Sequence, residues 1–180
     1  MDETERDLIL KAREGDGAAF ARLVSRYDRR ILGLALDMVG DAEDARDVFQ
    51  EAMLAAYRGL GKFRMESEFS TWLYRIAINR ALTFRNQRRR RFAPEASEVE
   101  VADGFGPERK VLDAELRAQL DRALEELSAK ERTAFVLCHR QGVKINRAAE
   151  LMDCSAGTVK SYLFRGRKKV KRLLQDYMER

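Results

Sequence analysis

The sequence contains few of the residues that stabilise a fold covalently or through a metal ion. Among its 180 residues are two cysteines, Cys138 and Cys154, and one histidine, His139. Two cysteines do not make the disulfide framework of a small secreted domain. A zinc site needs about four ligands at close spacing, and the sequence has no third cysteine or second histidine. We therefore expect partly buried structural thiols, no bound metal and no cofactor.

Long apolar runs and a positively charged start are also missing. No run approaches the ~18 apolar residues of a membrane span. The acidic residues Asp2, Glu3 and Glu5 oppose the positive start of a signal peptide. We therefore expect a cytoplasmic protein with no integral membrane segment.

Proline and glycine are scarce as well, at two and eleven residues, and few β-branched runs alternate. This scarcity predicts an all-α protein. Both prolines, Pro94 and Pro107, fall in an acidic, glycine-containing stretch without helical periodicity. We therefore predict two small helical domains, residues 1–91 and 110–180, joined by a flexible acidic linker, residues 92–109.

The charge is modest in total but unevenly placed. The sequence has 35 basic and 30 acidic residues, a formal net charge of +5 and a pI near 9.4. The basic residues cluster in two blocks, Arg85–Arg91 and Lys160–Arg172, which lie half a chain apart. This arrangement suggests two separate contacts with nucleic acid.

In the first predicted domain we expect a helix over Leu8–Glu14, another from about Ala18 to Val39, and a third that Asp41 caps. The third helix has one apolar stripe, which predicts its buried face: Ala42, Ala45, Phe49, Ala52, Met53, Ala56 and Leu60. The opposite face has Val48 and Leu54 among charges. That face is either simply solvated or a surface for protein docking.

A fourth helix is expected from Thr71, after a loop over residues 61–68. At 100° per residue, Trp72, Arg75, Asn79 and Asn86 share one side of it. Amides and guanidinium groups bind bases and phosphates, and aromatic rings stack on unpaired bases. The alternative is a packed tryptophan with a solvated polar edge.

The second domain has the pattern of a helix-turn-helix. Ser128 and Glu131 fit a capping box for a helix that ends near Gly142. A short helix over Asn146–Met152, a turn and a long basic helix capped by Ser155 follow.

The last helix has a packed side and, opposite to it, a basic side. The packed side has Val159, Leu163, Gly166 and Val170. The opposite side has Ser161, Phe164, Arg165, Lys168, Lys171 and Arg172, with Lys160 at its margin. A basic helix of this kind fits the major groove of DNA.

Three separated segments now point to one family. Phe69–Asn79 closely resembles the promoter-melting segment of extracytoplasmic-function sigma factors, which belong to the sigma-70 family. Asp41–Arg58 resembles their polymerase-binding helix, and Met152–Arg165 is similar to their second DNA-reading helix. The resemblance covers nearly the whole chain in the family's order.

The resemblance implies three sets of site residues. Core polymerase would be bound by Asp44, Asp47, Val48, Gln50, Glu51 and Leu54. The minus-10 element would be captured as a single strand by Phe63, Arg64, Trp72, Arg75, Asn79 and Arg80. Asn79 and the loop Phe63–Glu68 would hold a base pulled from the stack. The minus-35 element would be read by Thr158, Lys160, Ser161, Phe164, Arg165 and Lys168.

It also implies partners and a role. The first domain would dock on the clamp helices of the largest polymerase subunit, and the second domain would meet the flap of the second-largest subunit. Promoter DNA would be opened by binding, without catalysis by this chain, and an anti-sigma factor would regulate it. The sequence departs from the family's common residues at Arg147, Ala148, Tyr162 and Gly166. These departures predict a less rigid helix-turn-helix with rearranged phosphate contacts.

Other functions fit the sequence less well. A regulator with a similar helix-turn-helix would carry a sensory or phosphoacceptor domain, yet the first ninety or so residues show no βα alternation. A decoy that only binds an anti-sigma factor would not need the Trp72–Asn79 segment. An enzyme is disfavoured because one histidine and no paired carboxylates leave no acid–base pair.

Overall fold

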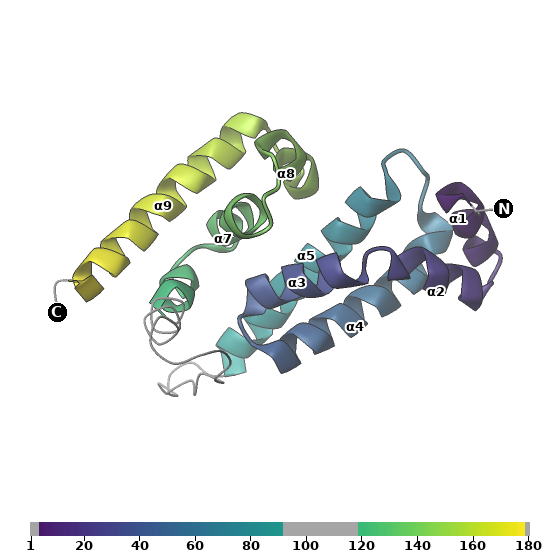
Figure 1. The fold of residues 1–180 in the computed structure, drawn as a ribbon, viewed down its shortest axis with the longest axis horizontal. Helices are drawn as coiled ribbons and strands as arrows, with labels where there is room; N and C mark the ends of the chain where they lie inside the picture. Colours follow the sequence, from purple (N-terminus) through teal and green to yellow (C-terminus); the bar gives the residue numbers. More distant parts are fainter. Residues whose placement is uncertain (1–3, 92–118, 179–180) are drawn as a thin grey trace, which may run out of the picture. The chain divides into compact units, whose positions relative to one another are not determined.

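The computed structural model describes residues 4–91 and 119–178 of the chain, and all regular structure in these ranges is helical (Figure 1). The chain divides into two compact units. The N-terminal unit is built mainly from α1–α5, and the C-terminal unit mainly from helix 119–125 and α7–α9. The predicted all-α class with two helical domains is thus confirmed. The predicted linker, residues 92–109, lies outside the described residues, so the exact domain boundaries stay a prediction.

The N-terminal unit is a bundle around one apolar core. Its elements are α1 (Glu5–Arg13), α2 (Gly17–Ser25), α3 (Asp28–Val39), α4 (Ala42–Gly59), the 3₁₀ turn η1 (Leu60–Lys62) and α5 (Phe69–Arg91). Helix α1 packs on α2, and α3 packs on α4. Each of these elements contributes at least one large, fully buried side chain: Leu8, Leu23, Ile31, Leu34, Met38, Val48, Leu60, Phe69 and Leu73.

The prediction of one helix over Ala18–Val39 is wrong, because the chain breaks at Tyr27 between α2 and α3. Tyr27 donates its backbone N–H to the carbonyl of Val24 at 2.8 Å, which tightens the end of α2. Its hydroxyl donates to the Glu5 carboxylate of α1, and its ring lies 5.7 Å from that of Phe69. The break therefore depends on tertiary contacts of Tyr27, and neither glycine nor proline marks it.

The predicted start of α4 is confirmed by its cap. Asp41 Oδ1 accepts from the backbone N–H of Glu43 at 2.8 Å and of Asp44 at 2.9 Å. Gly40 precedes it with φ 85°, a left-handed conformation that ends α3 at the lowest cost for glycine. The cap fixes where α4 begins and therefore which of its residues face outward.

The C-terminal unit contains the predicted helix-turn-helix. After helix 119–125 come α7 (Ala129–Phe135), the π-helical turn η2 (Val136–Arg140), α8 (Ile145–Met152) and α9 (Ala156–Met178). The capping box of Ser128 and Glu131 is present. The Ser155 hydroxyl accepts from the backbone N–H of Thr158 at 3.1 Å and so caps α9. Helices α7 and α9 pack on each other, and the short α8 precedes the turn into α9.

The packed side predicted for α9 is confirmed, since Val159, Leu163, Gly166 and Val170 are all buried. Gly166 lies in the middle of the helix and faces α7. A Cβ at Gly166 would lie 3.6 Å from Leu127 Cδ1 and 3.8 Å from the carbonyl oxygen of Glu131, which are ordinary contacts. The space for a methyl group therefore exists, and glycine here only adds freedom to the unfolded chain.

We expect Gly166→Ala to raise the free energy of unfolding of the C-terminal unit by about 0.5–1 kcal/mol. Gly142→Ala is the matched control, because Gly142 has φ 65°; it should lower that free energy by about 1 kcal/mol. Urea unfolding followed by far-UV circular dichroism measures both. The chain's single tryptophan, Trp72, lies in the N-terminal unit, so the fluorescence transition should not move. A destabilised Gly166→Ala would show that α7 and α9 cannot admit a methyl group.

Candidate nucleic-acid interfaces and docking face

The face predicted for docking on α4 is largely exposed. Asp47, Gln50, Glu51 and Leu54 are exposed, and Asp44 is half-buried. Leu54 is 53 % exposed, which is high for a leucine. A single exposed leucine is common on protein surfaces, so a docking face needs a further apolar residue beside it.

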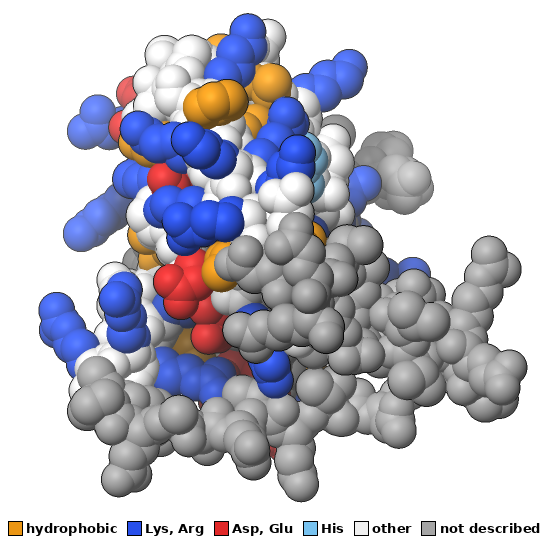
Figure 2. Space-filling model, turned by 90° about the vertical axis from the view of Figure 1, so that its left-hand side faces the viewer, with side chains coloured by type: hydrophobic (Ala, Val, Ile, Leu, Met, Phe, Trp, Pro, Cys, Tyr) orange, Lys and Arg blue, Asp and Glu red, His pale blue; other side chains and the backbone are white. Residues whose placement is uncertain are grey.

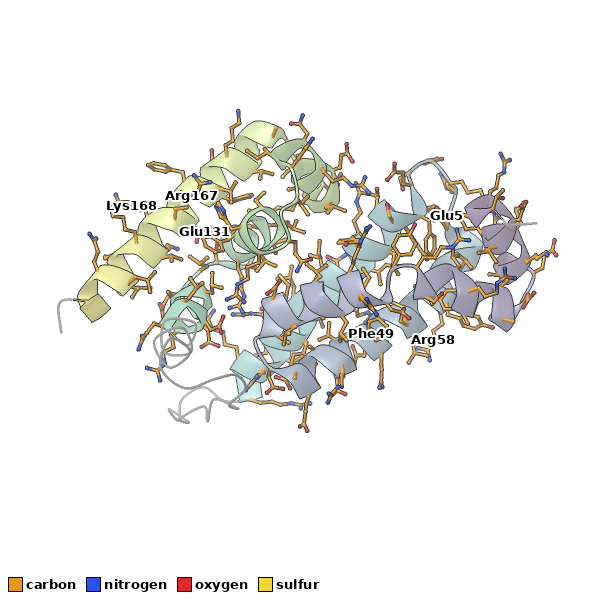
Figure 3. The ribbon with its side chains drawn as sticks, in the orientation of Figure 1. Glu5, Phe49, Arg58, Glu131, Arg167 and Lys168 are labelled. Atoms are coloured by element: carbon orange, nitrogen blue, oxygen red, sulfur yellow. The ribbon has the colours of Figure 1, made fainter. Side chains whose placement is uncertain are left out.

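Tyr57 belongs to the same face and was missed as a site residue. It lies three residues after Leu54, a spacing that makes neighbours on a helix, and it is 47 % exposed. One edge of its ring packs on Phe20 of α2, with ring centroids 5.1 Å apart. The sequence pattern of α4 could not single out Tyr57, because the ring that packs against it belongs to α2. Figure 3 labels Phe49 and Arg58 of α4 for orientation.

Val48 does not belong to the docking face, so this part of the prediction is wrong. Its side chain is 1 % exposed and lies in the core with Ala45, Ala52 and Ala56. The buried side of α4 therefore includes Val48, and Phe49, which was predicted to be buried, is only half-buried. Small alanines let the neighbouring helices approach closely on that side, and Val48 fills the space between them.

The residues predicted to meet the minus-10 element include part of an aromatic cluster. The ring of Phe63 lies 5.0 Å from that of Trp72 and 5.9 Å from that of Phe69. Phe63 is 5 % exposed, so most of its side chain supports the cluster from within. Trp72 is half-buried, and a Cβ at Gly59 would lie only 3.3 Å from its ring. Glycine at position 59 thus permits the ring to pack on α4.

Next to this cluster is a cavity of about 380 Å³. The loop and the start of α5 contribute one wall, and α1 contributes the other; the lining residues are Glu5, Arg6, Ile9, Phe63, Met65, Ser67, Glu68 and Phe69. Met65 has φ 57°, an unusual conformation for a residue other than glycine. The volume is in the range of pockets that take small ligands. The α1 wall was missed, because it is some sixty residues away in sequence.

Farther along α5, the polar residues of the predicted stripe are accessible. Asn79 and Arg80 are exposed, and Arg75 is half-buried. Arg64 in the loop is exposed and forms a 3.9 Å ion pair with Glu66, which contributes little at the surface. The last turns of α5 carry the exposed run Arg88–Arg91. The helix therefore presents amide and guanidinium groups along its length.

The basic side predicted for α9 is confirmed as an exposed surface. Its exposed members are Lys160, Ser161, Phe164, Arg165, Lys168, Lys171 and Arg172. Figure 2 shows Lys and Arg side chains gathered on the face that includes α9. Phe164 is 72 % exposed among these cations. Solvation alone does not favour a phenylalanine at this exposed position.

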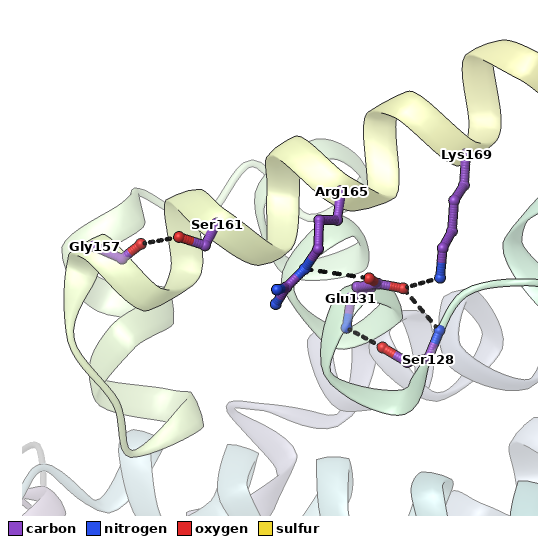
Figure 4. Close-up of polar contacts among 6 residues, drawn as sticks. All are labelled: Ser128, Glu131, Gly157, Ser161, Arg165 and Lys169. Atoms are coloured by element: carbon purple, nitrogen blue, oxygen red, sulfur yellow. Dashed lines mark hydrogen bonds and ion pairs between the residues drawn. The ribbon is translucent and has the colours of Figure 1, made fainter.

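Two of the predicted α9 residues are engaged within the helix. The Thr158 hydroxyl lies 2.9 Å from that of Ser155, so it is part of the cap, and Thr158 is half-buried. The Ser161 hydroxyl donates to the carbonyl of Gly157 at 3.1 Å (Figure 4). Ser161 remains exposed and keeps its oxygen as an acceptor.

Another predicted α9 residue, Arg165, contacts two neighbours. Its Nε lies 3.5 Å from Glu131 Oε1, and its Cζ lies 5.2 Å from the centre of the Tyr162 ring. Tyr162 is one of the departures from the family pattern. At this position the tyrosine ring supports the guanidinium group of Arg165.

Burial works to raise the pKa of Glu131, but hydrogen bonds from Lys169 and Ser128 outweigh it and hold this pKa below its ordinary value. Lys169 Nζ donates to Glu131 Oε2 at 2.7 Å. In this environment Glu131 is a carboxylate at neutral pH.

Burial and the charge of Arg167 act on both the single histidine and its neighbouring cysteine. Arg167 Nε donates to His139 Nε2 at 2.9 Å. Burial and then the Arg167 charge lower the pKa of His139, so it is a neutral acceptor. Burial raises the pKa of the Cys138 thiol, which keeps it protonated. Both cysteines are free and half-buried. Within residues 4–91 and 119–178, no helix is long and apolar enough to cross a membrane.

Comparisons with known proteins cover almost the whole chain. Residues 23–91 match the family model of sigma-70 region 2, and residues 117–170 match that of sigma-70 region 4. The RNA polymerase sigma-H factor of Pseudomonas aeruginosa is 39 % identical over 98 % of this chain and 96 % of its own length. The ECF RNA polymerase sigma-E factor of Escherichia coli K12 is 36 % identical over 98 % of this chain and 97 % of its own.

Solved structures have the same fold at lower identity. The structure of CnrH in complex with the cytosolic domain of CnrY aligns with a TM-score of 0.67 at 24 % identity, over 97 % of this chain and 99 % of that one. The sigma factor RpoE of Bartonella quintana, solved with the anti-sigma factor NepR, aligns with a TM-score of 0.63 at 23 % identity, over 87 % and 96 %.

The lowered pKa of Glu131 predicts acid sensitivity of the C-terminal unit. A carboxylate with a folded pKa below its ordinary value of 4.5 adds stability above that value, and the added stability is lost as pH falls through the folded pKa. Glu131→Gln should therefore lower the unfolding free energy at neutral pH by about 1 kcal/mol, with a difference that shrinks below pH 4.5.

Urea unfolding followed by circular dichroism at neutral and acidic pH measures this difference. The control is Glu125→Gln, which changes an exposed carboxylate of the same unit and should leave the pH dependence almost unchanged. A difference for Glu131→Gln that does not vary with pH would contradict the assignment.

Proposed function

Since this chain belongs to the sigma-70 family of RNA polymerase sigma factors, in its extracytoplasmic-function branch, we propose how its surfaces divide the work of initiation. As a sigma factor, it binds core RNA polymerase and directs transcription to specific promoters. The observation that carries the proposed division is that one chain holds a helix-turn-helix face on α9 and a separate polar stripe on α5.

The α4 face is the proposed contact with the clamp helices of the largest polymerase subunit. Its support is the exposed Leu54 among Asp47, Gln50 and Glu51. Tyr57 extends this apolar centre by one position and is partly fixed by Phe20. A small apolar centre within a charged rim is the common anatomy of a protein interface.

The α5 stripe and the adjoining loop are the proposed site for the minus-10 element as a single strand. Asn79 offers an exposed amide to a base edge, and Arg75, Arg80 and Arg64 offer positive charge to phosphates. The cavity between the loop and α1 would take a base out of the stack. Extruding one base requires a few kcal/mol, which contacts in the cavity would return. Phe63 and Trp72 keep this wall rigid.

The α9 face is the proposed reader of the minus-35 element. Lys160, Arg165 and Lys168 would reach guanine edges or phosphates, and Phe164 would meet a thymine methyl group. Ser155 caps the helix and so sets how its first turn meets the groove. The C-terminal unit would also meet the flap of the second-largest polymerase subunit.

The chain acts without catalysis of its own, by binding energy alone. Its place of action is the cytoplasm, where polymerase meets the chromosome. An anti-sigma factor regulates it by covering polymerase-binding surfaces, by analogy with its family.

Transcription in vitro tests the function directly. Purified chain added to core polymerase should produce transcripts with defined start sites on genomic fragments. Sequencing the starts that appear when the chain is overproduced supplies the promoters and both of their elements. Core polymerase that starts at the same sites without the chain, or no specific start on any fragment with it, would overturn the function.

The two faces of the N-terminal unit should separate by mutation. Leu54→Ala should weaken polymerase binding by about 1 kcal/mol while leaving unfolding unchanged, because Leu54 is exposed. Asn79→Ala should leave polymerase binding intact and weaken capture of single-stranded minus-10 DNA by the holoenzyme. Fluorescence anisotropy with labelled core polymerase and labelled DNA measures each step.

The control for this experiment is Val48→Ala, which leaves a cavity in the core and should lower the free energy of unfolding by about 1 kcal/mol or more. Its effect on polymerase binding should vanish once the folded fraction is taken into account. If Asn79→Ala weakens both steps, the two faces are not independent.

A further inference from the structure

A buried carboxylate lies between the two main helices of the C-terminal unit. Glu131 belongs to α7, and its side chain is 6 % exposed. Figures 3 and 4 show it on the side of α7 that faces α9. A buried charge is strongly unfavourable unless it is paired and hydrogen-bonded. Its partners therefore decide what it does.

The two oxygens of this carboxylate have different partners. Oε2 accepts from Lys169 Nζ at 2.7 Å and from the backbone N–H of Ser128 at 3.1 Å. These two bonds neutralise the charge and hold the group in one orientation. Oε1 faces Arg165 Nε at 3.5 Å (Figure 4). The carboxylate is thus held in place by Lys169 and Ser128 and forms an ion pair with one proposed DNA-reading residue.

Arg165 is consequently held at the base of its guanidinium group. Glu131 engages Nε, and the Tyr162 ring lies under the planar face at 5.2 Å. Figure 4 shows the two terminal nitrogens pointing away from Glu131. The terminal nitrogens are the pair that makes a bidentate contact with O6 and N7 of guanine. The side chain is still 56 % exposed, so DNA can reach it.

We propose that Glu131 is a positioning residue that sets base specificity in the minus-35 element by holding Arg165 for a guanine; this inference rests on the proposed role of α9. An arginine held in place loses less rotamer freedom when it meets its base. A free arginine would bind phosphates and several bases with little preference.

Replacing Glu131 should affect base specificity and general DNA affinity differently. Replacing the carboxylate by an amide would leave the charges of Lys169 and Arg165 uncompensated, so general DNA affinity should stay equal or rise. A residue that only stabilised the fold would instead weaken every contact when replaced. The proposal therefore predicts a loss of preference at one base pair without a general loss of binding.

The test uses holoenzyme reconstituted from core polymerase and the full chain. The template is a promoter found by transcript-start sequencing, with all four bases introduced at each position of its upstream element. Arg165→Ala identifies the position that Arg165 reads. Glu131→Gln should lower the preference at that same position by about fivefold and leave the others unchanged. Binding to an unrelated duplex should stay equal or become tighter.

Two further variants make the result decisive. The double variant Glu131→Gln/Arg165→Ala should match Arg165→Ala alone, since Glu131 acts through Arg165. Lys169→Met removes the other cation but leaves the Oε1 contact, so it should keep the base preference even where it lowers stability.

The outcomes distinguish the inference from the function beneath it. Equal losses at all positions, or an unchanged preference in Glu131→Gln, would overturn the positioning role while transcription itself persists. An Arg165→Ala variant with normal base preference would overturn it as well. A wild-type holoenzyme without any specific transcript would instead overturn the proposed function.

Discussion

Side-chain caps at helix starts are the constraint on which the other features depend. Without disulfides in its described part, the chain fixes its helices by packing and by caps at Thr4, Asp16, Asp41, Ser128 and Ser155. A cap defines the first residue of a helix, and the period of 3.6 residues then determines every later position around the axis. The exposed face of α4 and that of α9 both follow from a capped start.

The same rule explains what could be predicted from the sequence. Caps and the period are local, so the start of α4, the capping box of α7 and both sides of α9 could be predicted from the sequence. The break at Tyr27, the burial of Val48 and the burial of Phe63 could not, because each depends on contacts with other helices. A periodic pattern indicates how much of a helix surface is buried, but not which neighbouring helix packs against it.

The candidate sites divide along the same line. The residues of the α9 face were predictable because they lie within one helix. The cavity beside α5 was predictable only as a loop; its second wall, with Glu5 and Arg6, comes from α1. The roles of the surfaces came from the resemblance to sigma factors, since a polar stripe with an aromatic residue fits a solvated edge equally well. Geometry then removed Val48 from the contacting set and showed Phe63 as a buried residue that lines the cavity.

The distribution of charge shows why net charge says little about this molecule. An excess of five positive charges is small, yet the exposed side of α9 is mostly cationic and the exposed face of α4 is mostly acidic. Glu131 is the exception on the basic side, because it is an acid beneath the cations. If general affinity were the only requirement, an uncharged residue would serve better there, since it would leave the neighbouring cations free to attract phosphates. An acid that directs one arginine and is neutralised by Lys169 is consistent with selection among bases rather than for binding strength.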